Sequence, residues 1–297
     1  MIAVVGGYGV GLTMTVPRVP GAGETVSGGR LSSGHGGKGS NQAVAIRRLG
    51  HPAALFTAIG PDAAADAAAA FWAEEDVDAS AVVRSAEATM TGFILVDPSG
   101  ENRITIADGA LGALAAEDVD GFTATIERAA MLVVSLEVPP PVARRACQVA
   151  RAAGVPVLLN PAPALADREL AGLADILTPN RGELAELTGL PDASLDASLD
   201  ALRTWYPGRV VVTCGGDGAV VDDGTARTSV PAARVDRVVD TTGAGDSFTA
   251  ALAVALVEGS DLVAAARFAA TAAARSVTIA EVIPSLPTRA QLEEVDA

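Results

Sequence analysis

The sequence predicts an α/β fold in three layers, with helices on both faces of a mostly parallel sheet. Short apolar segments alternate with segments of helical periodicity over most of the 297 residues, which is the pattern of repeated βαβ units. The composition, 49% hydrophobic and 19% charged, is that of a globular protein rather than a disordered one. Two β-rich segments interrupt the alternation, and we expect them to form a small lid.

The alternating elements follow one another in a regular order. Ligands of such sheets bind beyond the carboxyl ends of the strands, so the loops after the strands are the first place to search for a site. The segments expected to form buried strands are 2–5, 54–58, 131–135, 155–159, 175–177 and 210–213. The segments expected to form helices are 40–49, 62–74, 140–153, 181–187, 195–205, 244–258 and 261–277.

Two segments, about 12–33 and 91–106, are expected to project from the sheet as the lid. The first holds the run Thr13-Met14-Thr15-Val16, followed by several prolines and glycines. The second is a predicted hairpin, because two β-rich runs flank the turn sequence Asp97-Pro98-Ser99-Gly100. We expect residues 1–297 to form a single domain that carries this lid.

The charge balance excludes several classes of partner. The chain has 36 acidic and 21 basic residues, a formal net charge of −15, so we expect no nucleic-acid partner and no membrane partner. A phosphate group must then be held by backbone dipoles, a few placed cations or a metal. Two cysteines, Cys147 and Cys214, and two histidines, His35 and His51, are too few for a disulfide framework or a histidine-based zinc site. Because the first residues do not resemble a signal peptide, we expect a cytoplasmic protein.

The chain has 31 glycines, and three clusters of them lie where a strand ends or a helix begins. The first, Gly6-Gly7-Tyr8-Gly9-Val10-Gly11, follows the first predicted strand. A dinucleotide site needs Gly-x-Gly-x-x-Gly at the start of a helix, whereas here the spacing differs and β-branched residues follow. A flexible strand exit is therefore favoured over a dinucleotide site.

The second cluster, Gly34-His35-Gly36-Gly37-Lys38-Gly39-Ser40-Asn41-Gln42-Ala43, runs into a predicted helix. It is not a Walker loop, because Gly39 stands where Ser or Thr should follow the lysine. Amides at a helix N-terminus together with one lysine suit an anion or a hydroxyl-rich ligand. A glycine-rich loop that only ends in an asparagine cap is an equally good interpretation of this cluster taken alone.

The third cluster, Asp240-Thr241-Thr242-Gly243-Ala244-Gly245-Asp246-Ser247-Phe248, precedes an apolar helix. Its glycines can present successive N–H groups to an anion at the helix N-terminus. A phosphate would repel Asp246 on the same turn, unless that carboxylate accepts the proton of a hydroxyl that attacks phosphorus. An acidic residue that only stabilises the helix dipole is the alternative.

Taken together, these clusters resemble the PfkB carbohydrate kinase family, in its ribokinase-like branch. Residues 36–45 and 240–248 are similar to the amino-terminal and carboxy-terminal signatures of the family. Three further motifs stand between them in the order of the family: Asn160-Pro161-Ala162-Pro163, Thr178-Pro179-Asn180-Arg181-Gly182-Glu183 and Thr213-Cys214-Gly215-Gly216-Asp217-Gly218. The five motifs span nearly the whole chain, and the resemblance implies the ribokinase-like α/β/α fold with a small β lid.

The resemblance implies phosphorylation of a hydroxyl of a sugar or sugar-like alcohol by ATP with Mg²⁺. It makes Asp246 the general base, and it makes an anion hole of the amides of Gly243, Ala244, Gly245 and Asp246. The residues that it assigns to the substrate are Gly37, Lys38, Gly39, Ser40, Asn41, Glu137 and Asp246. The residues that it assigns to ATP are Asn180, Thr213, Cys214, Gly215, Gly216, Asp217, Gly218, Gly245, Asp246 and Ala270.

The resemblance also implies two kinds of metal site. Asn180 and Glu183 match an Asn-x-x-Glu motif that helps to organise Mg²⁺, in agreement with the preference of this cation for oxygen ligands and retained waters. The residues that fall at an activating K⁺ site are Asp240, Thr242, Ser276, Ile279, Glu281 and Ser285. Most of those contacts would be backbone carbonyls, and Glu281 replaces a residue that is usually glycine in the family.

Sugar recognition departs from the family at the exit of the first strand. The family has an Asn-x-Asp there whose carboxylate binds sugar hydroxyls, and this sequence has Gly9 and Gly11. We expect these glycines to line the pocket without the usual polar contacts and to leave space for a bulkier substrate. Tyr8, Thr13 or His35 could supply hydroxyl contacts instead, although for His35 we favour a loop residue with its tip in water.

Three functional hypotheses follow. The first is a carbohydrate kinase, and the second is a nucleoside kinase of the same fold, for which the space at Gly9 and Gly11 is the reason. The third is a family member that binds a metabolite without catalysis, against which Asp246 and the Asn180–Glu183 pair argue. Because lids of ribokinase-like proteins pair between subunits, we expect a homodimer through the β lid.

Overall fold

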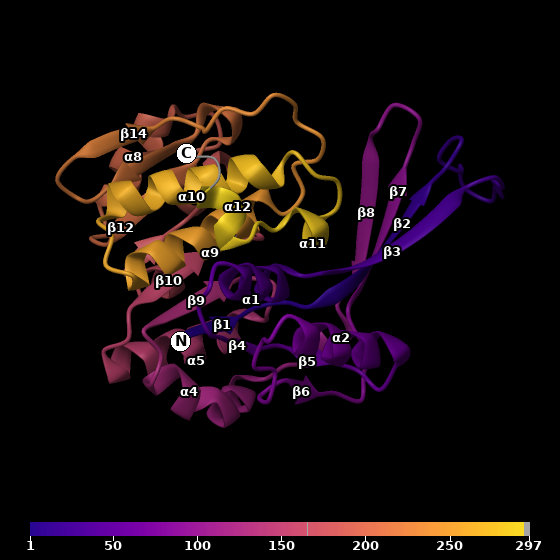
Figure 1. Ribbon diagram of the computed structural model, residues 1–297, viewed down its shortest axis with the longest axis horizontal. Helices are drawn as coiled ribbons and strands as arrows, with labels where there is room; N and C mark the ends of the chain where they lie inside the picture. The colour runs from indigo at the N-terminus through magenta and orange to yellow at the C-terminus, as the bar shows by residue number, and fades with distance from the viewer. Residues whose placement is uncertain (165, 294–297) are drawn as a thin grey trace.

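The computed structural model describes residues 1–164 and 166–293, so the last four residues of the predicted 1–297 domain lie outside the described residues. The body is an eight-stranded sheet between two layers of helices (Figure 1). Neighbouring strands are parallel except where β13 and β14 add an antiparallel edge, so the predicted class is confirmed. In spatial order the strands are β14 (Arg227–Val230), β13 (Ala219–Asp222), β12 (Arg209–Thr213), β11 (Ile176–Leu177), β10 (Val157–Asn160), β9 (Met131–Ser135), β1 (Ile2–Val5) and β4 (Ala53–Phe56).

The alternation of side chains along the central strands divides the core into two clusters. In β1, Ile2 and Val4 join one cluster while Ala3 and Val5 join the other, because successive side chains point to opposite faces of a sheet. The helices of the first layer are α1 (Lys38–Arg48), α2 (Ala63–Glu74), α9 (Ala244–Val257), α10 (Leu262–Ser276), α11 (Val282–Ser285) and α12 (Arg289–Glu293). The helices of the second layer are α3 (Gly109–Gly112), η1 (Ala116–Phe122), α4 (Thr123–Glu127), α5 (Pro140–Ala153), α6 (Arg168–Ala171), α7 (Arg181–Thr188) and α8 (Leu195–Arg203).

Most predicted elements lie within two residues of their observed bounds. Helix α5 occupies the predicted residues, because prolines begin it and Gly154, with φ +71°, ends it. The predicted strand 54–58 is in fact two strands, since β5 (Ala58–Ile59) leaves the main sheet and pairs with β6 (Val83–Arg84). The β13–β14 hairpin and the short helices between 109 and 127 were not predicted.

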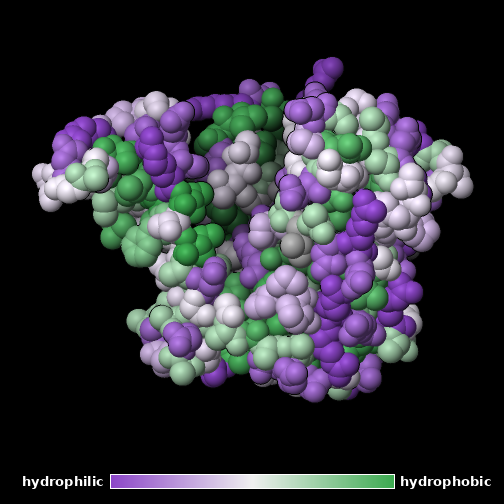
Figure 2. Space-filling model, turned by 180° about the vertical axis from the view of Figure 1, so that it is seen from behind, coloured by the Kyte–Doolittle hydropathy of each residue, from purple (hydrophilic) through white to green (hydrophobic). Residues whose placement is uncertain are grey.

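Four strands form a second sheet that stands off one end of the body, as Figure 1 shows at the right. We call this sheet the lid. Both expected lid segments contribute to it, although its first strand already begins at Gly9, where pairing with Gly36 starts. Figure 2 shows a hollow between the lid and the body, lined in part by hydrophobic side chains. In spatial order the lid strands are β3 (Arg30–Gly36), β2 (Gly9–Thr15), β7 (Thr91–Val96) and β8 (Asn102–Ala107).

The carboxyl ends of the parallel strands meet at one edge of the main sheet. The glycine-rich exit of β1, Glu137 after β9, Asn160 at the end of β10 and Asn180 after β11 all lie along this edge. Helix α1 begins at the same edge, because the Lys38 N–H donates to Glu137. Helix α9 begins beside it, because Asp246 on its first turn contacts Asn41 and Gln42. Among the described helices, none combines the length and the apolar character that crossing a bilayer requires.

Candidate active site

A buried carboxylate lies where α1 and α9 meet. Asp246, on the first turn of α9, is 5% exposed. Its Oδ2 accepts a hydrogen bond from Asn41 Nδ2 at 2.8 Å, and its Oδ1 accepts one from Gln42 Nε2 at 3.2 Å. The motifs around residues 41 and 246, about 200 residues apart in the chain, therefore form one site.

Three charged groups surround Asp246. Burial raises the pKa of the Asp246 carboxyl, although Lys38, Asn41 and Gln42 act in the opposite direction. Burial would lower the pKa of the Lys38 ammonium, but the carboxylates of Asp246, Glu137 and Glu183 outweigh it and raise that pKa. One lysine thus interacts with three acidic side chains. The site therefore carries excess negative charge and can accept a further cation.

Glu137 binds the start of α1. Its Oε2 accepts a hydrogen bond from the backbone N–H of Lys38 at 2.6 Å. Burial raises the pKa of Glu137 to about 7, with Asp246 adding to the effect and Lys38 opposing it. A side chain at Gly7 would collide with Glu137, so glycine at this position allows the carboxylate to approach the loop.

The start of α9 presents unpaired backbone donors. Gly243 has φ +81° and precedes the first helical residue, and Ser247 N–H donates to its carbonyl at 2.9 Å. Within the described residues, the N–H groups of Gly245 and Asp246 donate to no acceptor, as expected for a first helical turn. A Cβ atom at Gly245 would contact nothing within 4 Å. The predicted anion hole thus has free donors and open space beside Asp246.

Two predicted ATP segments are neighbours at the ends of β11 and β12. Asn180 and Glu183 form a capping box at the start of α7, with hydrogen bonds of 2.8 Å in both directions. Thr213 N–H donates to the Pro179 carbonyl at 2.9 Å, which joins this cap to the predicted nucleotide loop. Arg181 and Asp217 pair across the same junction at 2.9 Å.

The remaining ATP residues lie on either side of this junction. Cys214–Gly218 is a tight loop that contains a 3₁₀ turn, η2 (Gly215–Asp217), and Cys214 N–H donates to the Gly218 carbonyl at 2.7 Å. Gly216 has nothing within 4 Å of its Cβ position. Ala270 is a core residue of α10, a helix that packs on β13 and β14 beyond the loop.

Two of the residues assigned to the substrate, Ser40 and Gly39, pack against the body of the protein. Ser40 is fully buried, its hydroxyl accepts a hydrogen bond from Trp72 Nε1 at 2.9 Å, and its N–H donates to the Gly7 carbonyl. Its side chain therefore faces the core rather than the site. A Cβ atom at Gly39 would lie 2.6 Å from Gly6 Cα, so this glycine allows α1 to pack closely on the exit of β1.

The predicted cation site consists of two segments that touch. Asp240 Oδ1 accepts from the N–H of Thr242 at 2.9 Å, and its Oδ2 accepts from the N–H of Glu281 at 3.0 Å. Glu281 has φ +68° and ψ 152°, a conformation that favours glycine. Ser276 and Ser285 are buried with hydroxyls bonded to nearby carbonyls. Ile279 lies in the same segment, between Ser276 and Glu281, and its N–H donates to the Ser276 carbonyl at 3.2 Å. The K⁺ site stays a prediction.

His35 is not the solvent-facing loop residue that we expected. It belongs to β3, its ring stacks on Phe71 with centroids 4.3 Å apart, and its Nδ1 lies 2.8 Å from the Tyr8 hydroxyl. Tyr8 is fully buried. These two side chains are therefore engaged with each other and with α2.

One face of the lid carries glycines where β2 and β3 pair. Register places Gly9 opposite Gly36, and Gly11 opposite Gly34 and beside Gly92, so all five share a face. None of them has a positive φ, and the backbone conformation does not require glycine there.

Most of these glycines have room for a side chain. A Cβ atom at Gly34 would contact nothing within 4 Å, and one at Gly11 would lie 3.6 Å from Ile94. At Gly9 the space is filled, because Met90 Cε lies 2.5 Å from the Cβ position. The vacant space that we expected at both Gly9 and Gly11 is thus present only at Gly11 and its neighbours on β3.

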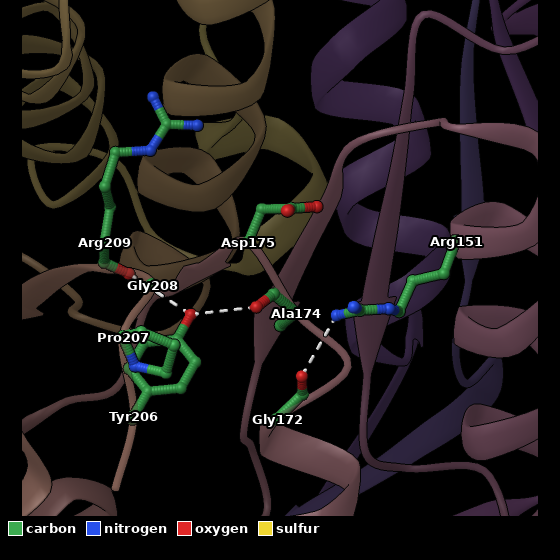
Figure 3. A pocket seen from close by; sticks show the side chains of 8 residues that line it. All are labelled: Arg151, Gly172, Ala174, Asp175, Tyr206, Pro207, Gly208 and Arg209. Carbon is green, nitrogen blue, oxygen red and sulfur yellow. Dashed lines mark hydrogen bonds between the residues drawn. The ribbon is translucent and has the colours of Figure 1, made fainter. Parts of the chain in front are cut away.

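A separate pocket lies at the opposite edge of the main sheet (Figure 3). Arg209 begins β12 and Asp175 directly precedes β11, so this pocket is at the amino ends of the strands. The Tyr206 hydroxyl donates to the Ala174 carbonyl at 3.2 Å, and Arg151 donates to the Gly172 carbonyl at 3.2 Å. Two of its polar side chains, Tyr206 and Arg151, thus bond to main-chain carbonyls of the pocket's own wall.

Comparison with known proteins identifies the family. The model of the pfkB family carbohydrate kinases matches residues 1–289. The chain belongs to this family. It is therefore a carbohydrate kinase, a phosphotransferase with an alcohol acceptor, and ATP use is a property of its relatives. The predicted resemblance is confirmed.

Members of the pfkB family resemble this chain over nearly its whole length. Ribokinase of Haemophilus influenzae is 35% identical over 99% of this chain and 97% of its own length. Deoxyribokinase of Salmonella typhi is 34% identical over 99% of this chain and 97% of its own length. The structure of Arabidopsis thaliana ribokinase complexed with ribose and ATP has a TM-score of 0.93 and 30% identity, covering 99% of this chain and 97% of that one.

Gln42 and Asn160 were not among the predicted site residues. Gln42 Nε2 contacts both Asp246 and Asn160 Oδ1, the latter at 3.3 Å. Both residues lie inside the family motifs, so the sequence indicated that they matter but did not indicate that they contact Asp246 or each other. Their contacts could not be predicted because they join positions 118 and 204 residues apart.

Proposed function

We propose that this chain transfers the γ-phosphoryl group of ATP to a hydroxyl of a sugar or sugar-like alcohol, with Asp246 as general base. The observation that carries the proposal is the position of this buried carboxylate, on the first turn of a helix where the N–H groups of Gly245 and Asp246 are free among the described residues, while that of Ala244 donates to the Thr241 carbonyl at 3.3 Å. A hydroxyl beside Asp246 can lose its proton to the carboxylate as it attacks phosphorus. The free amides can stabilise charge on the transferring group.

The other residues of the site bind and orient the two substrates. Lys38, the first residue of α1, supplies a cation near the reacting groups, and Glu137 accepts a hydrogen bond from its backbone N–H. We propose that Asn41 also contacts the substrate, because its buried Oδ1 has no partner among the described residues. The loop at Thr213–Gly218 offers backbone groups to the nucleotide phosphates.

The residues at the junction of β11 and α7 fit a magnesium ion held through water. Both carboxylate oxygens of Glu183 already accept hydrogen bonds from Asn180, so direct ligation would break the cap that starts α7. Lone pairs remain for waters of the cation, which Mg²⁺ usually retains. The metal would supply positive charge that offsets ATP and the surrounding carboxylates.

The experiment that tests the proposal is a screen for ADP release with Mg-ATP against pentoses, hexoses, polyols and nucleosides. We expect turnover with at least one sugar or polyol. Silence across the panel, with ATP binding intact by calorimetry, would favour the non-catalytic hypothesis. Turnover with nucleosides alone would favour the nucleoside kinase, for which the side-chain-free lid face at Gly11, Gly34, Gly36 and Gly92 is the specific support.

The Gly11→Asp variant tests whether the missing carboxylate sets the substrate. We expect it to lower KM for ribose about tenfold or more, because a hydrogen bond to a charged partner contributes about 1.5–3 kcal/mol. The Cβ atom fits, since its nearest neighbours lie at 3.6 and 4.0 Å. Gly121→Asp, which also has open space at its Cβ position, is the matched control and should leave KM unchanged. An unchanged KM for ribose in Gly11→Asp would contradict this explanation.

The titration of Glu137 should appear in the pH profile. Because the pKa of Glu137 is raised to about 7, the carboxylate is protonated below that pH and ionised above it. We expect kcat/KM for the sugar to fall as pH drops through about 7, since the protonated group is a poorer acceptor for the Lys38 amide and a sugar hydroxyl. In Glu137→Gln the step near pH 7 should disappear. Persistence of the same step in that variant would assign it to another group.

We also propose that the lid joins two copies of the chain. Met14, Leu31 and Phe93 are large apolar side chains that are 38%, 63% and 51% exposed. Register places Met14 opposite Leu31 and Phe93 beside Leu12, so all three lie on the face of the lid opposite to the glycines. A soluble monomer rarely exposes a contiguous apolar surface. Sedimentation should give a dimer for the wild type and a monomer for the Leu31→Lys/Phe93→Lys variant. A wild-type protein that stays monomeric at all concentrations would contradict this proposal.

A further inference from the structure

A row of buried amide contacts runs from the Asp246 carboxylate into the core. Gln42 Nε2 lies 3.2 Å from Asp246 Oδ1 and 3.3 Å from Asn160 Oδ1. Asn160 Nδ2 in turn lies 3.0 Å from the carbonyl oxygen of Thr178. Gln42 is fully buried, and Asn160 and Thr178 are 8% and 2% exposed. Because water is excluded, these contacts form a fixed arrangement.

The direction of every hydrogen bond in this row follows from the Thr178 carbonyl. A backbone carbonyl can only accept, so Asn160 must turn its NH₂ group toward it and its Oδ1 toward Gln42. Gln42 must then present its own NH₂ group, one proton to Asn160 and the other to Asp246. The reversed amide would place Gln42 Oε1 against two acceptors. The row therefore ends in a donor aimed at the carboxylate.

Gln42 keeps this orientation at a cost. Its Oε1 is buried without a partner among the described residues, and an unpaired buried acceptor is unfavourable. An apolar side chain of the same length would fill the volume without that penalty. The amide is thus better explained by its effect on Asp246 than by packing.

The surroundings of Asp246 show what the donor does. Glu137 after β9 and Glu183 on α7 oppose the negative charge of Asp246, while Lys38, the first residue of α1, favours it. Burial raises the pKa of Asp246, and the amides of Asn41 and Gln42 oppose that rise. With each carboxylate oxygen held by one amide, the remaining lone pairs are left for a substrate hydroxyl.

We propose that Gln42, oriented by Asn160, is a positioning residue. It keeps the Asp246 carboxylate ionised and holds its oxygens in the orientation needed to accept the proton of the substrate hydroxyl. The proposal rests on the proposed function of Asp246 as general base. Asn160 acts on the carboxylate only through Gln42. Its own orientation is set by its hydrogen bond to the Thr178 carbonyl.

The test is a double-mutant cycle with Gln42→Met and Asn160→Leu, both of similar volume to the residues they replace. We expect kcat to fall about tenfold to a hundredfold in Gln42→Met, as for loss of a hydrogen bond to a charged group. The double variant should be no slower than Gln42→Met alone, because Asn160 acts through Gln42. The acidic limb of kcat should move to higher pH by about one unit, since a lost donor raises the pKa of a carboxyl.

A merely structural role would not move the pH limb. Thr57→Val, which removes a buried hydroxyl that has no partner among the described residues, is the control and should leave kcat and the limb unchanged. If Gln42→Met does not fold, Gln42→Leu removes the same donor without adding a charge and should shift the limb in the same direction. An unmoved limb, or effects of the two substitutions that multiply, would overturn the proposal. Full turnover in Asp246→Asn would instead overturn the proposed function itself.

Discussion

The Asp246→Asn variant should bind ATP but turn over about 10²–10⁴ times more slowly than the wild type, the usual contribution of a positioned base. The substituted amide has the same shape but cannot accept a proton. In the wild type each carboxylate oxygen accepts from one amide, Asn41 or Gln42. Asparagine at position 246 has one oxygen and one NH₂ group, so whichever way it turns, its NH₂ group faces the NH₂ group of one of these two amides. We therefore also expect a lower melting temperature.

Two measurements separate these effects. Single-turnover rates at saturating ATP report the chemical step, and calorimetry reports nucleotide binding. Asp261→Asn is the matched control, because Asp261 caps α10 by accepting from the Ala264 N–H at 2.8 Å and asparagine caps equally well. Near-normal turnover of Asp246→Asn, with Asp261→Asn unchanged, would remove Asp246 from the role of base.

The parts of the fold that follow from local sequence could be predicted. Helix α5 has its proline start and its glycine stop in the sequence itself, and β1 is a short apolar run that ends at Gly6 and Gly7. The β13–β14 hairpin was missed because β14 is mostly polar and lies at the sheet edge, where half-exposed strands lose the apolar signal that marks central ones.

The parts of the site that depend on distant contacts could not be predicted. The sequence places Ser40 beside Lys38 and Asn41, but the turn of α1 sends its side chain to Trp72, 32 residues away. The space at Gly9 looked vacant because nothing local indicates that Met90 would occupy it. The residue types indicate which segments form the site, whereas tertiary packing determines which of their side chains point into it.

The Gly243→Ala variant should show the second large effect, a loss of about 10²–10³ in kcat, as for removal of an oxyanion-hole donor. Gly243 has φ +81°, and an added Cβ atom would lie 2.8 Å from Val282 Cγ1. Alanine at this φ costs about 1–2 kcal/mol, and the turn can relieve the strain only by rotating the peptide that begins α9. That rotation would move the N–H groups of Gly245 and Asp246 away from the transferring phosphoryl group.

A glycine at the other end of the same helix separates strain from catalysis. Gly259 has φ +93° and nothing within 4 Å of its Cβ position, and it follows the carboxyl end of α9, away from the phosphoryl site. Gly259→Ala should therefore lower the melting temperature to a similar degree and leave kcat unchanged. If Gly243→Ala loses stability but keeps its turnover, the amides at the start of α9 do not stabilise the transferring group. If only Gly243→Ala loses turnover and it still binds ATP, the N–H donors on the first turn of α9 stabilise the transition state rather than the bound ground state.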